Sequence, residues 1–269
     1  MRKRKVGLVF SGGGAKGAYH LGVWKAIREL GLENIISGVS GSSIGALTGY
    51  MFSVKEYEKS YQLWYSSALE TNPDTKMSKL IGYKNSSAIN NLKNNIFLSS
   101  KKIDNLLDSI VNVNKLKNSN CKCYVTCHNY HSKQAETFLL SKYSQEEIKN
   151  ILKASASIPL IFKKVKINGK TYYDGGLSDN TPIRPLYENG YNIIIVVYLD
   201  ENKHIDYRFY PDAEFIEIYP KSFIGNFRDG VLDFRIDKIN YLIKKGYQEA
   251  HSILLDNLGY LKSEFKKLK

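Results

Sequence analysis

A serine between two glycines, in the segment 41–45 (GSSIG), is the residue of this chain best suited to covalent chemistry. A β-prone apolar run at 35–39 precedes it, and apolar residues at helical spacing follow it. Gly-x-Ser-x-Gly between a strand and a helix is typical of a nucleophile elbow, which lifts the serine hydroxyl to a helix N-terminus. Its three defining residues are Gly41, Ser43 and Gly45. Turns that only cap a helix have the same pattern, so both interpretations stay open.

A glycine-rich loop, residues 12–17 (GGGAKG), follows the first predicted strand at 6–10. It fits Gly-x-Gly-x-x-Gly, but a dinucleotide site needs an acidic residue at the end of the second strand, and none follows that strand before Glu56. It is not a Walker loop, because Lys16 is followed by Gly17. Glycine N–H groups that point one way can instead hold the anionic oxygen of a tetrahedral intermediate. We therefore expect an oxyanion hole formed by four consecutive residues: Gly12, Gly13, Gly14 and Ala15.

An aspartate with two following glycines, Asp174, Gly175 and Gly176, comes after the β-prone residues 171–173. The glycines leave the carboxylate in an open turn. Taken alone, the tripeptide is more typical of a turn aspartate that bonds its own backbone.

The elements that position these residues predict the fold. Strand, glycine turn and helix occur twice within the first 50 residues, which indicates a parallel α/β sheet whose turns face one crevice. Further strands are predicted at 121–126, 135–140, 191–199 and 215–219, and helices at 103–110, 146–156 and 236–258. The strand at 191–199 is the most apolar, so we expect it to be central. We expect an α/β fold of the three-layer αβα type with a mainly parallel central sheet.

No repeat or linker divides the chain, so we expect one domain over 1–269. Within it, 71–98 is polar and poorly periodic and is predicted to be a variable insertion or lid. The segment 236–269 is predicted to be a C-terminal helix and tail. No apolar run approaches the ~18 residues of a membrane helix, and the run at 6–10 is too short for a signal peptide. We expect a cytoplasmic protein that can act peripherally at membranes.

The formal net charge is +13, and residues 71–170 hold most of the excess, with seventeen Lys and Arg against six Asp and Glu. These are scattered lysines rather than the arginine forks that read bases, so we expect no nucleic-acid partner. An anionic membrane surface and simple solvation both remain compatible with the excess. In the first case apolar residues of 71–98 touch acyl chains while lysines hold head groups. The oligomeric state is not predicted.

Taken together, the triple glycine, the Gly-x-Ser-x-Gly segment and the distant Asp-Gly-Gly resemble the patatin-like phospholipases. The resemblance covers most of the chain and is weakest at 71–98. It is carried by "GLVFSGGGAKGAYHLGVWKAIRELG", "ISGVSGSSIGALTGYMF", "FLSSKKIDNLLDSIV", "ILKASASIPLIFKKVKINGKTYYDGGLSDNTPI" and "LDFRIDKINYLIKKGYQEA". The usual family loop begins Asp-Gly-Gly-Gly and then has an arginine, whereas Ser11 and Lys16 stand at these positions here. The expected oxyanion hole uses backbone N–H groups and not these two side chains, so both differences are compatible with an oxyanion hole.

The resemblance implies that Ser43 is a nucleophile and Asp174 its base, in a dyad without histidine. It also implies an acyl-enzyme, lipid acyl esters such as phospholipids or lysophospholipids as substrates, and no cofactor. The motif residues around the dyad are then Lys16, Gly17, Gly41, Gly45, Gly175 and Gly176.

Several alternatives stay open. A Ser-Asp-His triad would need His204 or His251, the two histidines that follow Asp174. Cys121, Cys123 and Cys127 match no standard zinc spacing and are expected to pack as small apolar residues, so we expect no metal. A carboxylesterase or thioesterase with the same dyad, or a non-enzymatic dinucleotide-binding regulatory domain, would also fit parts of the pattern.

Overall fold

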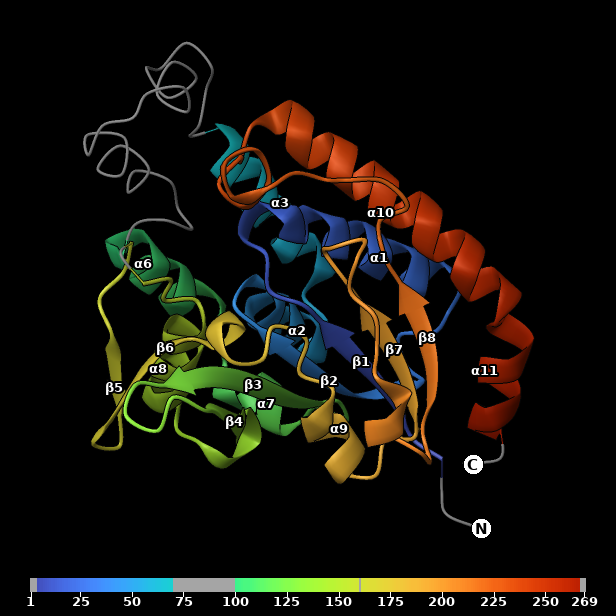
Figure 1. Cartoon of the computed structure of the whole chain (residues 1–269), viewed down its shortest axis with the longest axis horizontal. Coiled ribbons are helices and arrows are strands. Elements are labelled where there is room, and N and C mark those ends of the chain that lie inside the picture. The colour runs from blue at the N-terminus through green and yellow to red at the C-terminus, as the bar shows by residue number, and fades with distance from the viewer. Residues whose placement is uncertain (1–3, 70–99, 160, 267–269) are drawn as a thin grey trace.

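A single twisted sheet organises the molecule (Figure 1). The computed structural model describes residues 4–69, 100–159 and 161–266. In these residues the sheet has eight strands, in the order β5-β6-β3-β2-β1-β7-β8, with β4 paired to β3. Strands β3, β2, β1, β7 and β8 are parallel to one another, whereas β4 and β6 pair antiparallel with β3, and β5 pairs antiparallel with β6. The strands are β1 (Val6–Phe10), β2 (Ile36–Ser42), β3 (Lys122–Asn129), β4 (Ala135–Leu139), β5 (Val165–Ile167), β6 (Lys170–Asp174), β7 (Ile193–Val197) and β8 (Glu214–Ile218).

Two strands share one side of β3. Strand β2 pairs with its first part, ending with Ser42 opposite Thr126. Strand β6 pairs with the rest from the opposite direction, with Asp174 opposite Cys127. Both bond the side of β3 that β4 leaves free, since Cys127 pairs with β4 as well. The C-terminal ends of β2 and β6 therefore meet head to head.

The two faces of the sheet are covered unequally. Side chains alternate between faces along a strand, so Leu8 and Phe10 of β1 join the larger apolar core while Val9 joins a smaller one. Helices that cover the larger core are α1 (Ala18–Glu29), α2 (Ile44–Ser53), α3 (Tyr57–Leu69), α6 (Ser100–Ile110), α8 (Gln145–Ser155) and α10 (Ile236–Asp256). The smaller core lies under the short α9 (Arg184–Glu188) and the loop that carries Ile205. The described part of the second helical layer is therefore thin.

Helices α1 and α10 pack directly against each other, with their backbones in close contact, on the side of the sheet that holds the larger core (Figure 1). A Cβ on Gly22 would lie 2.0 Å from the main-chain oxygen of Ile243, and one on Gly246 would lie 2.2 Å from that of Tyr19. The Tyr19 hydroxyl donates to buried Glu249 at 2.8 Å. The C-terminal helix is thereby fixed against the helix that follows the glycine-rich loop.

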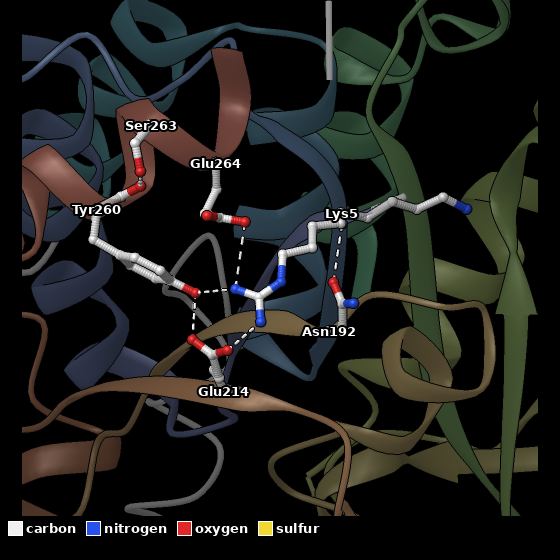
Figure 2. Close-up of polar contacts among 7 residues, drawn as sticks. Lys5, Asn192, Glu214, Tyr260, Ser263 and Glu264 are labelled. Atoms are coloured by element: carbon white, nitrogen blue, oxygen red, sulfur yellow. Dashed lines mark hydrogen bonds and ion pairs between the residues drawn. The ribbon is translucent and has the colours of Figure 1, made fainter. Parts of the chain in front are cut away.

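The two ends of the described chain meet beside β8. Figure 2 shows Tyr260 and Glu264 of α11 (Leu258–Lys266) on one side and Glu214 of β8 on the other. The Arg4 guanidinium donates to the Tyr260 hydroxyl at 2.6 Å, lies 3.4 Å from Glu264 and also pairs with Glu214. Next to it, the Lys5 N–H donates to Asn192 Oδ1 at 3.1 Å. This cluster joins the segment entering β1 to the last helix.

The expected α/β class with a mainly parallel sheet is confirmed, and the strand predicted at 6–10 coincides with β1. The strand expected to be central, β7, instead lies next to the edge strand β8; it is fully buried because β1, β8 and both cores surround it. The helix predicted at 236–258 ends at Asp256, and a second helix, α11, occupies the expected tail to Lys266. The segment 71–98 lies outside the described residues, and the single domain stays a prediction.

Candidate active site

The turn between β2 and α2 holds Ser43 in a strained conformation, with φ 57° and ψ −128°. Glycine is required on both sides of it, because a side chain at Gly41 or Gly45 would clash with the backbone. A Cβ on Gly41 would lie 2.2 Å from the Gly45 main-chain oxygen, and one on Gly45 would lie 2.1 Å from the Phe10 oxygen. The segment is thus a sharp strand-to-helix turn that presents a side chain at the N-terminus of α2.

The Ser43 hydroxyl donates to Oδ2 of Asp174 at 2.6 Å. The other carboxylate oxygen accepts the Gly176 N–H at 2.8 Å. Both members of this pair are 6 % exposed. Burial raises the pKa of Asp174 to about 6, although the hydrogen bonds from Ser43 and Gly176 lower it in part. Above that pH the carboxylate can take the proton of an attacking hydroxyl.

The glycine-rich loop lies beside the pair and forms a short 3-10 turn at Gly14–Gly17. The Gly12 N–H is not free, because it donates to the Asn180 main-chain oxygen at 2.9 Å. Ala15 is fully buried outside the cavity wall. In the described chain the N–H groups of Gly13 and Gly14 have no protein acceptor, and both residues line the cavity. Of the four expected oxyanion donors, these two therefore have N–H groups that remain available at the cavity wall, and the oxyanion hole itself stays a prediction.

The remaining motif glycines allow neighbouring segments to pack closely against the loop and the turn. A Cβ on Gly17 would lie 2.5 Å from the Ile44 side chain, so this residue lets the loop pack on α2. A Cβ on Gly175 would meet the Thr126 main-chain oxygen at 2.1 Å, and one on Gly176 would meet the Asn180 side chain at 2.7 Å. These contacts explain why two glycines follow the aspartate.

A cavity of about 330 Å³ opens above the pair. Its apolar wall consists of Ile158, Pro159, Leu177, Leu199, Phe227 and Val231. Lys16 also lines it, and burial lowers the pKa of this lysine although Asp200 and Glu201 act in the opposite direction. The arrangement combines a hydroxyl, a base, two backbone donors and an apolar pocket, which are the parts needed for acyl transfer to serine.

Comparison with known proteins assigns the chain. A family model described as "Patatin-like phospholipase" matches residues 8–187. The chain belongs to the patatin-like phospholipase family. It is 25% identical over 206 residues to "Lysophospholipase NTE1" of Cryptococcus neoformans, and 39% identical over 84 residues to "Neuropathy target esterase sws" of Drosophila persimilis. These matches cover 72% and 27% of this chain, but only 11% and 6% of those much longer proteins.

A solved structure supports the same fold. VipD from Legionella pneumophila matches with a TM-score of 0.54 and 16% identity, covering 95% of this chain and 67% of VipD. At this level of identity the match concerns the fold alone.

Two residues that support this patatin-like site were missed by sequence reasoning. Ser155, in the last turn of α8, accepts the Ser43 N–H at 3.0 Å and donates to the Thr126 main-chain oxygen at 2.7 Å. Asn180 bonds Gly12 through its main-chain oxygen and, through its side chain, donates to the Gly12 carbonyl at 3.2 Å. Both lie in the stretch that resembles the family, but no local pattern distinguishes them from other polar residues.

The histidines lie elsewhere in the described chain. His204 and His251 pack against tyrosine rings, at 6.1 and 5.5 Å between ring centroids, and neither lines the cavity. His20 is fully buried against Phe10, and burial lowers its pKa to about 3. His128 bonds Ser178. The geometry therefore gives no histidine to the Ser43–Asp174 pair.

The three cysteines are buried, and burial raises the pKa of each thiol, to about 12 for Cys121. Cys127 donates to the Ile151 main-chain oxygen at 3.5 Å. Within the described ranges no group of three or more His, Cys, Asp and Glu residues is arranged to hold a metal ion, and no helix is both long and apolar enough to cross a bilayer.

Proposed function

We propose that this protein is a serine lipid acyl hydrolase of the phospholipase A or lysophospholipase type. The observation that carries the proposal is the 2.6 Å hydrogen bond from Ser43 Oγ to Asp174, made at a strained turn beside two free backbone N–H groups. Family membership supports ester hydrolysis, and the names of the relatives, a lysophospholipase and an esterase, support lipid esters.

The proposed reaction uses the Ser43–Asp174 hydrogen bond and the glycine-rich loop. Asp174 takes the hydroxyl proton as Ser43 Oγ attacks the ester carbonyl, and the N–H groups of Gly13 and Gly14 stabilise the resulting oxyanion. The carbon–oxygen bond to the alcohol breaks, and the leaving alkoxide receives the proton from Asp174. Water then attacks the acyl-enzyme while Asp174 takes its proton, and the returning proton frees Ser43 and the fatty acid. A carboxylate near pKa 6 is a weaker base than imidazole, so oxyanion stabilisation must supply much of the rate.

The proposed substrate site combines apolar walls with cations. Lys16 and Lys203 line the cavity together with its apolar residues, a combination suited to an acyl chain linked to an anionic group. Charge over 71–170 adds long-range attraction to an anionic membrane surface, worth about 1 kcal/mol per lysine near that surface. A cytoplasmic location stays a prediction.

Two measurements test the proposal. A fluorophosphonate probe should label the parent protein at Ser43 and leave Ser43→Ala unlabelled. Mass spectrometry of a mixed-lipid extract should then detect free fatty acid and lyso-lipid or glycerophospho products that depend on Ser43. Cleavage of short esters and thioesters with no change in the lipid extract would favour the carboxylesterase or thioesterase alternative. Labelling at another serine would overturn the assignment.

A further inference from the structure

Two large apolar side chains remain exposed at the mouth of the cavity. Leu177 and Phe227 are each 54 % exposed, and both line the catalytic cavity. Exposed apolar groups that gather at a concave site mark a surface that meets another apolar phase. Below we call these two residues the mouth pair.

Each member of the mouth pair belongs to a segment that contacts one half of the catalytic machinery. Leu177 ends the 3-10 turn Gly175–Leu177, which begins directly after Asp174. Phe227 begins the π-helical turn Phe227–Val231, whose last residue packs against the oxyanion loop. There a Cβ on Gly14 would lie 2.3 Å from the Val231 main-chain oxygen. The pair thus connects the surface at the mouth to both the base and the oxyanion donors.

Charges at the mouth nearly balance. The cationic side chains Lys16 and Lys203 share the cavity wall with Asp200. The acidic groups of Glu201 and Asp229 also act on Lys16, in the direction that raises its pKa, and the cation of Lys238 acts in the opposite direction. Attraction at this face therefore depends on apolar contact more than on charge.

We propose that Leu177 and Phe227 insert into the surface of a phospholipid bilayer and seat the cavity mouth on it. The inference rests on the proposed function, because a lipid substrate must leave its bilayer and reach Ser43 without exposing its acyl chain to water. Seating the mouth on the bilayer joins the apolar cavity wall to the lipid phase. Insertion of half-exposed side chains adds binding without any membrane-spanning helix.

Fluorescence tests the depth of insertion. The probe is Phe227→Trp in the Ser43→Ala protein, with phosphatidylcholine vesicles that the enzyme then cannot degrade. The matched control is Phe209→Trp, since Phe209 is 64 % exposed but lies outside the cavity wall. Both native tryptophans, Trp24 and Trp64, are buried and contribute a constant background. We expect vesicles to shift emission of the Trp at 227 to shorter wavelength, and brominated acyl chains to quench it, with neither effect at 209.

Binding tests the contribution of the pair. In the Ser43→Ala protein, Leu177→Ser combined with Phe227→Ser should lower partitioning onto phosphatidylcholine vesicles about tenfold or more. The control combines Leu255→Ser and Phe209→Ser, which replace side chains that are 50 % and 64 % exposed away from the cavity, and should change it less than twofold. Circular dichroism verifies that both proteins are folded.

Equal loss in both double variants, or no vesicle binding by the Ser43→Ala protein, would overturn the proposal; the second result would leave a protein partner to explain the exposed pair. Hydrolysis of a soluble short-chain ester by the parent tests the proposed function separately. An active parent with an unresponsive Trp at 227 therefore rejects insertion alone. An inactive parent with an inserting mouth pair rejects the hydrolase alone.

Discussion

The two residues of the proposed catalytic pair are held in different ways. Ser43 is fixed by its own segment. Main-chain oxygens lie so close to Gly41 and Gly45 that a side chain at either position would clash, so the turn can only be this tight with glycines there. Asp174 lies 131 residues away and is fixed by pairing, because β2 and β6 end at adjacent residues of β3. The nucleophile therefore depends on steric fit within its own segment, whereas the base depends on a long-range register.

Removing either half should have the largest effect. Ser43→Ala and Asp174→Asn should each lower ester hydrolysis by about 10⁴-fold or more, because one removes the nucleophile and the other the proton acceptor. Rates on a soluble ester measure this loss. Substantial activity in either folded variant would contradict the pair.

Asp174→Asn should also change the free energy of unfolding, and we expect it to raise that free energy at pH 8. Folding raises the pKa of Asp174, so its contribution to stability is present below its unfolded pKa and is lost as pH rises to about 6. At pH 8 the buried carboxylate therefore costs the native state about 1–3 kcal/mol, which a neutral amide avoids. Thermal unfolding at pH 8 should show Asp174→Asn more stable than the parent, and a lower midpoint would contradict the assigned cause.

Breaking the turn should be the next largest effect. Gly45→Ala places a methyl group 2.1 Å from the Phe10 oxygen, so backbone must shift at the elbow. We expect at least about 100-fold loss of kcat, with destabilisation of about 2–4 kcal/mol. The control is Gly49→Ala in the same helix, where the nearest atom is a Val39 methyl at 3.2 Å that can move. Similar kinetics for the two variants would argue against steric control of the turn.

Activity should follow the ionisation of the base. Because the carboxylate form accepts the proton, kcat/KM should rise with pH and level off above about pH 6. Below that pH it should fall about tenfold per unit, while the fold persists. A pH profile on a neutral soluble ester measures the free enzyme, and a midpoint near pH 4 would mean that burial does not raise this pKa.

The turn that holds Ser43 could be predicted from the sequence pattern, whereas the strand pairing that places Asp174 beside it could not. Glycine spacing and apolar periodicity are local, so they predicted β1, the elbow and the start of α2. That Asp174 faces Ser43 required the family resemblance, because no pattern within 170–176 says that β6 abuts β2. The engaged Gly12 N–H was equally hidden, since its acceptor is a main-chain oxygen at Asn180.

A smaller effect should come from removing the Ser155 hydroxyl, which connects the Ser43 turn to strand β3. Ser155 bonds both the Ser43 N–H and the oxygen of Thr126, on the strand that aligns β2 with β6. Ser155→Ala leaves a buried N–H unsatisfied, which costs about 1–3 kcal/mol, and should lower kcat about tenfold with little change in KM. The control Ser157→Ala loses only a hydroxyl bonded to Lys153, so it should stay near the parent. Equal rates for the two variants would contradict a positioning role for Ser155.

The smallest effect should come from replacing the histidines. This replacement tests whether a third catalytic group acts together with Ser43 and Asp174. A third group acting through imidazole would have to reach Asp174 or Ser43, yet His204 lies against Tyr219 and His251 lies against Tyr247, outside the cavity wall. His204→Ala and His251→Ala should therefore keep hydrolysis within about threefold of the parent. A triad that loses its histidine falls about 10⁴-fold or more, so the two mechanisms differ by orders of magnitude in one assay. Because His204 is exposed in a loop and His251 is only half-buried on α10, their removal should leave the fold intact, and circular dichroism checks this. A collapse of activity in either folded variant would mean that the chain rearranges in solution to bring a histidine to the pair, and the dyad would give way to a triad.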